Sequence, residues 1–107
     1  MQKLKYKEVR EYREKFLEEQ ENRCGLCGDE IEPEKAVLDH DHKSGQLRSV
    51  LHRGCNALLG KIENSMPMNQ VDEQRLSEIC KNLVEYRHKK KDLLHPTFKD
   101  KKTKKSK

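Results

Sequence analysis

Two pairs of metal-binding side chains constrain this chain more than any other feature. Cys24 and Cys27 form the first pair, His52 and Cys55 form the second, and 24 residues separate the two pairs. Zinc in structural sites takes four sulfur or nitrogen ligands in a tetrahedron, and two such pairs from separate turns supply them. We therefore expect one closed zinc site that joins the segments on either side of residues 28–51.

The composition explains why a metal is needed. The 107 residues are 40% charged and 32% hydrophobic, with no Trp, so a domain built from them has a thin apolar core. Small domains of this kind commonly gain their missing stability from a bound metal or from disulfides. The zinc site would supply that stability here.

The expected location of the chain favours a metal over disulfides. The N-terminus is charged and lacks the apolar run of a signal peptide, and no stretch is apolar enough to span a membrane. We expect an intracellular, cytoplasmic protein (in the host cytoplasm if a bacteriophage encodes it), where thiols stay reduced. A redox pair of Cys24 and Cys27 is the alternative, but it leaves Cys55 unexplained. Cys80 lies on an apolar helical stripe and is interpreted as a small buried hydrophobic residue.

Hydrophobic periodicity predicts an α+β fold that is mostly helical. Apolar residues recur at helical spacing near the N-terminus and again in the C-terminal third. Two short apolar runs on either side of a turn-forming stretch at residues 41–45 indicate a β-hairpin. We expect helices at 5–21 and 70–92, strands at 36–39 and 46–51, and a short helix containing Ala57, Leu58, Leu59 and Ile62 that ends at residues 64–67.

The basic charge is concentrated at the C-terminus. Residues 99–107 contain six lysines and one aspartate, whereas the other 98 residues contain 18 basic and 18 acidic side chains. We expect a disordered basic tail at 99–107. Residues 1–98 are assigned to a single domain with the zinc-containing core at 23–63.

Acids and histidines alternate at the end of the first strand, in the run Leu38-Asp39-His40-Asp41-His42. Strands favour β-branched and aromatic residues, so strand propensity does not explain this choice. Phosphodiester hydrolysis needs a base that activates water and a metal that neutralises charge at the phosphate. An imidazole suits the first task, and the oxygens of Asp39 and Asn56 suit Mg²⁺. A polar turn with accidental histidines is the alternative interpretation.

The chain resembles the phage recombination endonuclease VII family, a branch of the HNH or ββα-metal nucleases. The resemblance rests on Cys24-x-x-Cys27, the run at 38–42, Gly45-x-Leu47-Arg48 and Cys55-Asn56-x-x-Leu59-Gly60, and it extends to Leu94-His95-Pro96. Two positions depart from the family. His52 stands where a Cys is usual, which still leaves a good zinc site. Ser49 stands where Gly is usual, which disfavours a close backbone approach there.

The resemblance implies a ββα-metal (HNH) core between an N-terminal helix and a long C-terminal helix. It implies that Asp39 and Asn56 bind a catalytic Mg²⁺ or Mn²⁺, that His40 is the general base, and that His42 supports the reaction near the scissile phosphate. Family members cut DNA, and the founding type resolves branched structures such as Holliday junctions. We therefore expect a metal-dependent DNA endonuclease that either resolves junctions or nicks DNA.

One geometric requirement follows from these roles. In a regular strand, Asp39 and His40 point to opposite faces, yet both must serve one phosphate. The first strand must therefore end or distort at this point.

Basic residues near the proposed site are candidates for DNA contacts. Lys43, Arg48, Arg53 and Lys61 flank the site and could hold phosphates, although ordinary solvated surface charge explains each of them equally well. The lysine tail could add sequence-independent affinity for DNA or serve only solubility. Two cuts in a junction need two active sites, so the resemblance suggests a homodimer, which periodicity alone leaves open.

Two other functions fit parts of the sequence. A non-catalytic zinc-containing module that binds nucleic acid does not need Asp39, His40 and Asn56 together. A small protein that engages a host partner through its helices explains the apolar stripes and not the polar run. The endonuclease accounts for both and is the favoured hypothesis.

Overall fold

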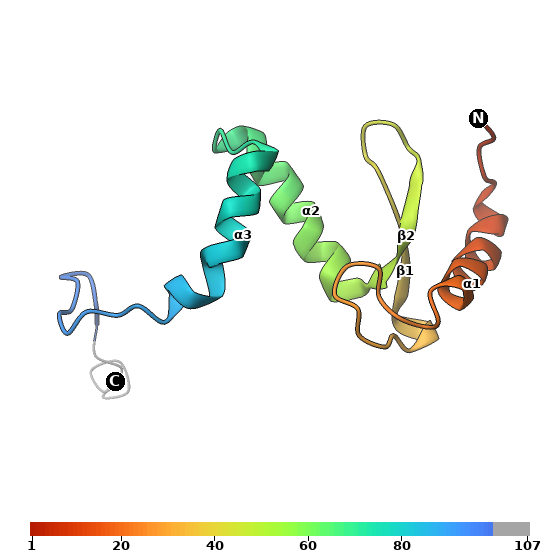
Figure 1. The fold of residues 1–107 in the computed structure, drawn as a ribbon. Helices are drawn as coiled ribbons and strands as arrows, with labels where there is room; N and C mark the ends of the chain where they lie inside the picture. The colour runs from red at the N-terminus through yellow and green to blue at the C-terminus, as the bar shows by residue number, and fades with distance from the viewer. Residues whose placement is uncertain (100–107) are drawn as a thin grey trace, which may run out of the picture. The chain divides into compact units, whose positions relative to one another are not determined.

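The computed structural model describes residues 1–99, and the chain divides into two units. The first unit covers Met1–Val71 and the second begins at Asp72. The basic tail expected at 99–107 lies outside the described residues except for Lys99. In chain order the elements are a 3-10 turn at Tyr6–Glu8, α1 at Val9–Glu19, a 3-10 turn at Pro33–Lys35, β1 at Ala36–His40, β2 at Leu47–His52, α2 at Arg53–Met68 and α3 at Glu73–Arg87 (Figure 1).

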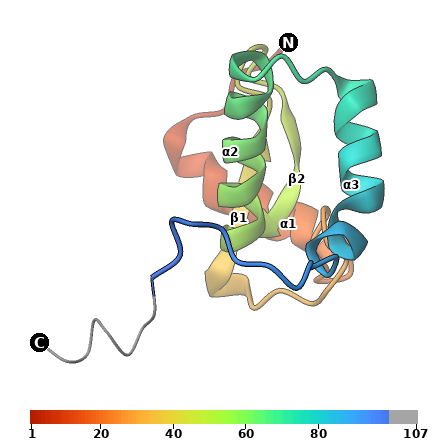
Figure 2. The same cartoon turned by 90° about the vertical axis from the view of Figure 1, so that its left-hand side faces the viewer.

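A two-stranded antiparallel hairpin forms the centre of the first unit. Both α1 and α2 contact both strands, and the hairpin lies between the two helices in Figure 1. Figure 2, turned so that α2 faces the viewer, shows the hairpin behind α2. This confirms the α+β, mostly helical architecture, with a helix before the hairpin and helices after it. Its small core consists of six buried apolar residues, namely Leu17, Cys24, Ile31, Ala36, Val50 and Leu51.

The outer edge of β2 is closed by a side chain. The Gln20 amide oxygen accepts from the Val50 N–H at 2.8 Å, and its nitrogen donates to the Val50 carbonyl at 2.9 Å. Gln20 thus replaces the peptide group of a third strand, so the fully buried Val50 keeps both backbone hydrogen bonds. This contact fixes the end of α1 against the hairpin.

Helix α2 is longer than the sequence predicts. It begins at Arg53 and includes Pro67 in its last turn, so the expected end at residues 64–67 is wrong. A proline near the end of a helix removes only one backbone hydrogen bond, so Pro67 does not end α2. The helix ends because the backbone after it turns back. Gln70 takes a φ of 56°, and the Val71 N–H turns back to the Met66 carbonyl at 2.8 Å, which closes the helix in a Schellman motif.

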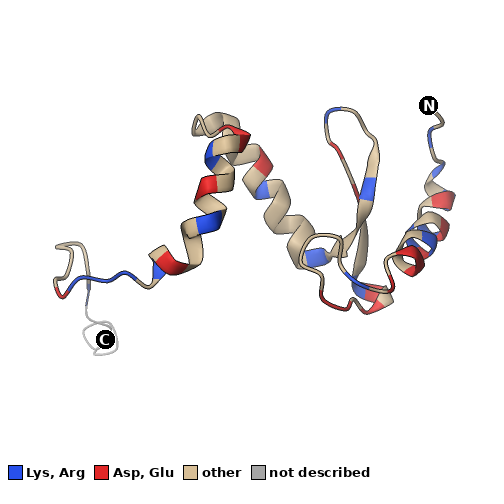
Figure 3. Cartoon of the chain, viewed as in Figure 1, with Lys and Arg blue, Asp and Glu red and all other residues tan. Residues whose placement is uncertain are grey.

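Helix α3 begins at an N-cap, where the Asp72 side chain accepts from the Arg75 N–H at 2.8 Å. The prediction that Cys80 is buried is wrong, because Cys80 is exposed. Ile79 and Leu83 of the same apolar stripe are 41% and 47% exposed. Acidic and basic residues mix along α1 and α3, whereas α2 carries few charges (Figure 3). None of the helices within residues 1–99 is long and apolar enough to cross a bilayer.

Candidate active site and metal centre

The four predicted zinc ligands lie together at the base of the hairpin. Cys24 and Cys27 belong to the turn before β1, His52 ends β2, and Cys55 lies in the first turn of α2. Their ligand atoms all lie within 4.8 Å of one another. Cys27 Sγ is 3.3 Å and Cys55 Sγ 3.7 Å from His52 Nδ1. A tetrahedral zinc with ordinary bond lengths places such sulfur and nitrogen atoms about 3.5 Å apart, so this cluster suits structural zinc.

A hydrogen bond selects the nitrogen of His52 that faces the cysteines. His52 Nε2 lies 2.8 Å from the Glu30 carbonyl oxygen, which can only accept. Nε2 therefore carries the proton, and the lone pair of Nδ1 points to the sulfur atoms. Metal-binding histidines are commonly held in this way by a carbonyl on their second nitrogen.

The sulfur atoms differ in their protonation. Burial raises the pKa of Cys24, but hydrogen bonds from the backbone N–H groups of Cys27, His52 and Leu26 outweigh it and lower the pKa to about 6. Burial, followed by the neighbouring sulfurs of Cys27 and Cys24, raises the pKa of Cys55 to about 11. The lowered pKa favours the thiolate form of Cys24, whereas the raised pKa favours the protonated thiol of Cys55. A metal cation bound between the sulfur atoms would stabilise both of them as thiolates.

The first strand was expected to end or distort here, and β1 ends at His40, with Asp39 buried and His40 exposed. A β-bulge lies beside Asp39 on the partner strand, β2. Leu38 pairs with Val50 and His40 with Leu47, so Arg48 and Ser49 together oppose the single residue Asp39. A bulge of this kind turns the side chains of β2 away from their regular alternation.

Asp39 is the one buried charged or polar residue of the described chain, with 5% of its surface exposed. Arg48 Nε donates to Asp39 Oδ2 at 2.6 Å, and Nη2 donates to Oδ1 at 3.2 Å. This bidentate pair offsets the cost of burying the carboxylate.

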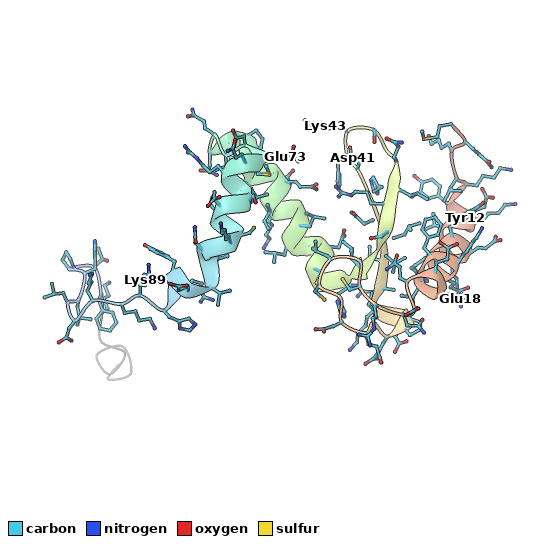
Figure 4. The ribbon with its side chains drawn as sticks, in the orientation of Figure 1. Tyr12, Glu18, Asp41, Lys43, Glu73 and Lys89 are labelled. Carbon is cyan, nitrogen blue, oxygen red and sulfur yellow. The ribbon has the colours of Figure 1, made fainter. Side chains whose placement is uncertain are left out.

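The two histidines after the first acid lie side by side and are exposed. The ring centroids of His40 and His42 are 4.8 Å apart, with the planes tilted by 31°. Asp41 between them shapes the loop, since its Oδ1 accepts the N–H groups of Lys43 and Ser44 at 2.8 and 2.9 Å. These hydrogen bonds lower the pKa of Asp41. Figure 4 shows Asp41 and Lys43 in the loop that joins the two strands.

Asn56 and the basic candidates occupy different surroundings. Asn56 is half-buried in the first turn of α2, and its side chain makes no hydrogen bond within the described residues, so its amide oxygen is available. Lys43, Arg53 and Lys61 are exposed and form no ion pair in residues 1–99. Arg48 differs, because its guanidinium is shared between Asp39 and Glu63.

Two contacts near the site were not foreseen from the sequence. Ser49 does have a close backbone neighbour, because a Cβ at Gly25 would overlap its hydroxyl oxygen. Glu63, on α2, accepts from Arg48 Nη1 at 2.8 Å. Asn56 and Glu63 are seven residues apart and therefore lie on the same face of α2. This spacing is the sequence signal that could have identified Glu63.

A protein-family comparison identifies the chain. The family model described as Recombination endonuclease VII matches residues 1–89. The match includes both metal-ligand pairs, the hairpin and all three α-helices. The chain therefore belongs to the recombination endonuclease VII family and is an endonuclease, a phosphodiester hydrolase whose substrate is DNA.

Proposed function

We propose that the protein is a metal-dependent DNA endonuclease in which His40 is the general base and Asp39 and Asn56 hold a divalent ion, Mg²⁺ or Mn²⁺. The observation that carries the proposal is the placement of Asp39. A carboxylate that is 5% exposed, directly before an exposed histidine and next to a β-bulge, is costly to maintain for stability alone. Membership of an endonuclease family supports a catalytic role for this buried carboxylate.

The Cys24, Cys27, His52 and Cys55 cluster holds a structural zinc in this proposal. Its support is the mutual distance of the four ligand atoms, within 4.8 Å, and the orientation of His52 by Glu30. Three sulfurs and one nitrogen close a tetrahedral site, so this zinc has no open position for a phosphate. Catalysis therefore falls to the oxygen and imidazole groups near the bulge.

The donors near the bulge suit a hard divalent ion. Each Asp39 oxygen accepts one hydrogen bond from Arg48 and keeps a lone pair, and the Asn56 amide oxygen is uncommitted. When bound there, the ion supplies stabilisation of the charge that develops on the phosphate. The chain's own contribution is to present two oxygen ligands from two elements, β1 and α2.

His40 removes the proton from the attacking water. It is exposed at the end of β1, where a DNA strand can reach it, and an imidazole nitrogen is the usual acceptor for such a proton. His42, whose ring centroid is 4.8 Å from that of His40, is placed to contact the same phosphate. Lys43, Arg53 and Lys61 are free to contact neighbouring phosphates of the DNA.

Cleavage of supercoiled plasmid and of a four-way junction, with Mg²⁺ or Mn²⁺, tests the proposal. We expect metal-dependent cutting by the zinc-loaded protein and a loss of about 10²-fold or more in His40→Ala, the usual contribution of a general base. His88→Ala, another exposed histidine, is the matched control and should cut normally.

The outcomes separate the alternatives. Nicking of the plasmid alone identifies a nickase, whereas paired cuts in the junction identify a resolvase and favour a homodimer with two active sites. No cutting of either DNA by a folded, zinc-loaded protein that still binds DNA would reject catalysis in favour of a nucleic-acid-binding module.

A further inference from the structure

Arg48 directs its hydrogen bonds to carboxylates of its own chain. Nε and Nη2 donate to the two oxygens of Asp39, and Nη1 and Nη2 donate to Glu63 Oε2 and Oε1 at 2.8 and 3.3 Å. These contacts use most of the five N–H groups of a guanidinium. Little of Arg48 is therefore left for a DNA phosphate.

The β-bulge is what makes this contact possible. Arg48 and Ser49 oppose Asp39 together, so Arg48 leaves the regular alternation of β2. Its Nε then reaches Asp39 Oδ2 at 2.6 Å, the shortest contact that it makes. The bulge in β2 and the bidentate Arg48–Asp39 pair therefore depend on each other.

Glu63 extends the network to α2. It lies seven residues, or two helical turns, after Asn56, so both side chains project from the same face of the helix. The series Asp39, Arg48 and Glu63 thus ties the strand that carries one proposed metal ligand to the helix face that carries the other.

The charge of the network suits a cation. Two carboxylates and one guanidinium leave a net charge of −1, which attracts a metal ion and repels phosphate. The hydrogen bonds that Arg48 donates to Glu63 and Asp39 raise the pKa of Arg48, so its positive charge persists at any working pH. The Asp39 carboxylate is held in one orientation while a lone pair on each oxygen stays available.

We infer that Arg48 and Glu63 are positioning residues of the catalytic metal site, which orient the Asp39 carboxylate and hold it against the Asn56 face of α2. This inference rests on the proposed function, in which Asp39 and Asn56 bind the ion. It gives Arg48 a role other than phosphate binding and gives Glu63 a role that the family motif residues do not include.

Mn²⁺ binding to the zinc-loaded protein without DNA tests the inference, with Asp39→Asn as the baseline for binding elsewhere. Arg48→Lys conserves every charge but cannot form the bidentate pair, and Glu63→Gln conserves size. We expect Mn²⁺ affinity to fall about tenfold or more in both variants, the usual effect of losing a group that holds a metal ligand. Glu14→Gln, which breaks the exposed Arg10–Glu14 pair on α1, is the matched control and should bind Mn²⁺ normally.

DNA affinity measured without divalent ions distinguishes the two roles of Arg48. A positioning role leaves this affinity unchanged in Arg48→Lys and Glu63→Gln, while zinc content and melting temperature report whether each variant is folded. Weaker DNA binding with unchanged Mn²⁺ affinity would overturn the inference and make Arg48 a phosphate contact. If Arg48→Lys loses its zinc, Glu63→Gln decides alone.

The inference and the proposed function fail in different ways. Wild-type protein that binds no Mn²⁺ above the Asp39→Asn baseline overturns the metal site and the inference together. Wild-type protein that binds Mn²⁺ and cuts DNA, beside variants with the same Mn²⁺ affinity, overturns the inference alone.

Discussion

Gly25 shows how one residue sets the fit between the cysteine turn and the hairpin. Its N–H donates to the Val50 carbonyl at 3.0 Å, so its backbone lies directly against β2. A Cβ there would overlap the Ser49 hydroxyl oxygen and lie 3.0 Å from Ser49 Cβ. Ser49 is thus accommodated because the opposing residue has no side chain.

Gly25→Ala should therefore destabilise the zinc-loaded protein by about 1–3 kcal/mol, the usual cost of overpacking. Ser49→Gly in the same chain should restore part of this loss, because it removes the atoms that the new Cβ meets. Gly60→Ala is the control: nothing lies within 4 Å of its Cβ position, and alanine favours a helix interior by about 1 kcal/mol. Urea unfolding gives the free energy of unfolding of the wild type, Gly25→Ala, the double variant and Gly60→Ala. A Gly25→Ala cost that Ser49→Gly does not reduce would contradict the proposed clash.

The residues of the site differ in how far the sequence alone predicts them. The Cys24-x-x-Cys27 and His52-x-x-Cys55 spacings are local, and the structure brings all four ligand atoms together as predicted. The contact of Arg48 with Glu63 joins residues 15 positions apart on two elements and depends on a bulge. No local pattern encodes that register shift. The sequence indicated that the first strand must end or distort near Asp39, but it did not indicate a bulge on the second strand.

At the scale of elements, the cysteine and histidine cluster joins three segments that the apolar core holds only weakly. The turn at Cys24, the end of β2 and the first turn of α2 meet there. Helix boundaries were harder to predict than helix existence. The Asn64-Ser65-Met66-Pro67 sequence looks like a helix stop, yet α2 passes through it to Met68, and a Schellman motif with Gln70 closes the helix. A stop of that kind depends on backbone hydrogen bonds more than on residue type.

Loss of one ligand should separate these segments. Cys55→Ala is expected to lose the bound zinc and most of the cooperative unfolding transition, because metal binding and folding are coupled in such sites. Cys80→Ala, at an exposed cysteine on α3, should keep one zinc per chain and an unchanged transition. Elemental analysis and thermal unfolding of the two variants make the comparison. Equal zinc content in both would show that Cys55 is not a ligand.

At the scale of the whole molecule, the distribution of charge decides how DNA is bound. The net charge of +5 equals the charge of residues 99–107, so the rest of the chain is neutral. Arg48, a basic residue beside the site, is neutralised by Asp39 and Glu63. A DNA-binding face on residues 1–98 must therefore come from local clusters of basic side chains and not from an overall positive charge.

This distribution predicts that the tail supplies most of the sequence-independent affinity for DNA. Its six lysines would displace counterions from up to six phosphates, so deletion of residues 99–107 should flatten the plot of log affinity against log salt by about 5. Replacement of the six lysines by arginine should keep the steep slope, because the charge is unchanged. Binding measured over a range of salt concentrations without Mg²⁺ gives the slope before any cutting occurs. If the slope is the same with and without the tail, the lysines serve solubility, and the exposed basic side chains of the body must hold the DNA by themselves.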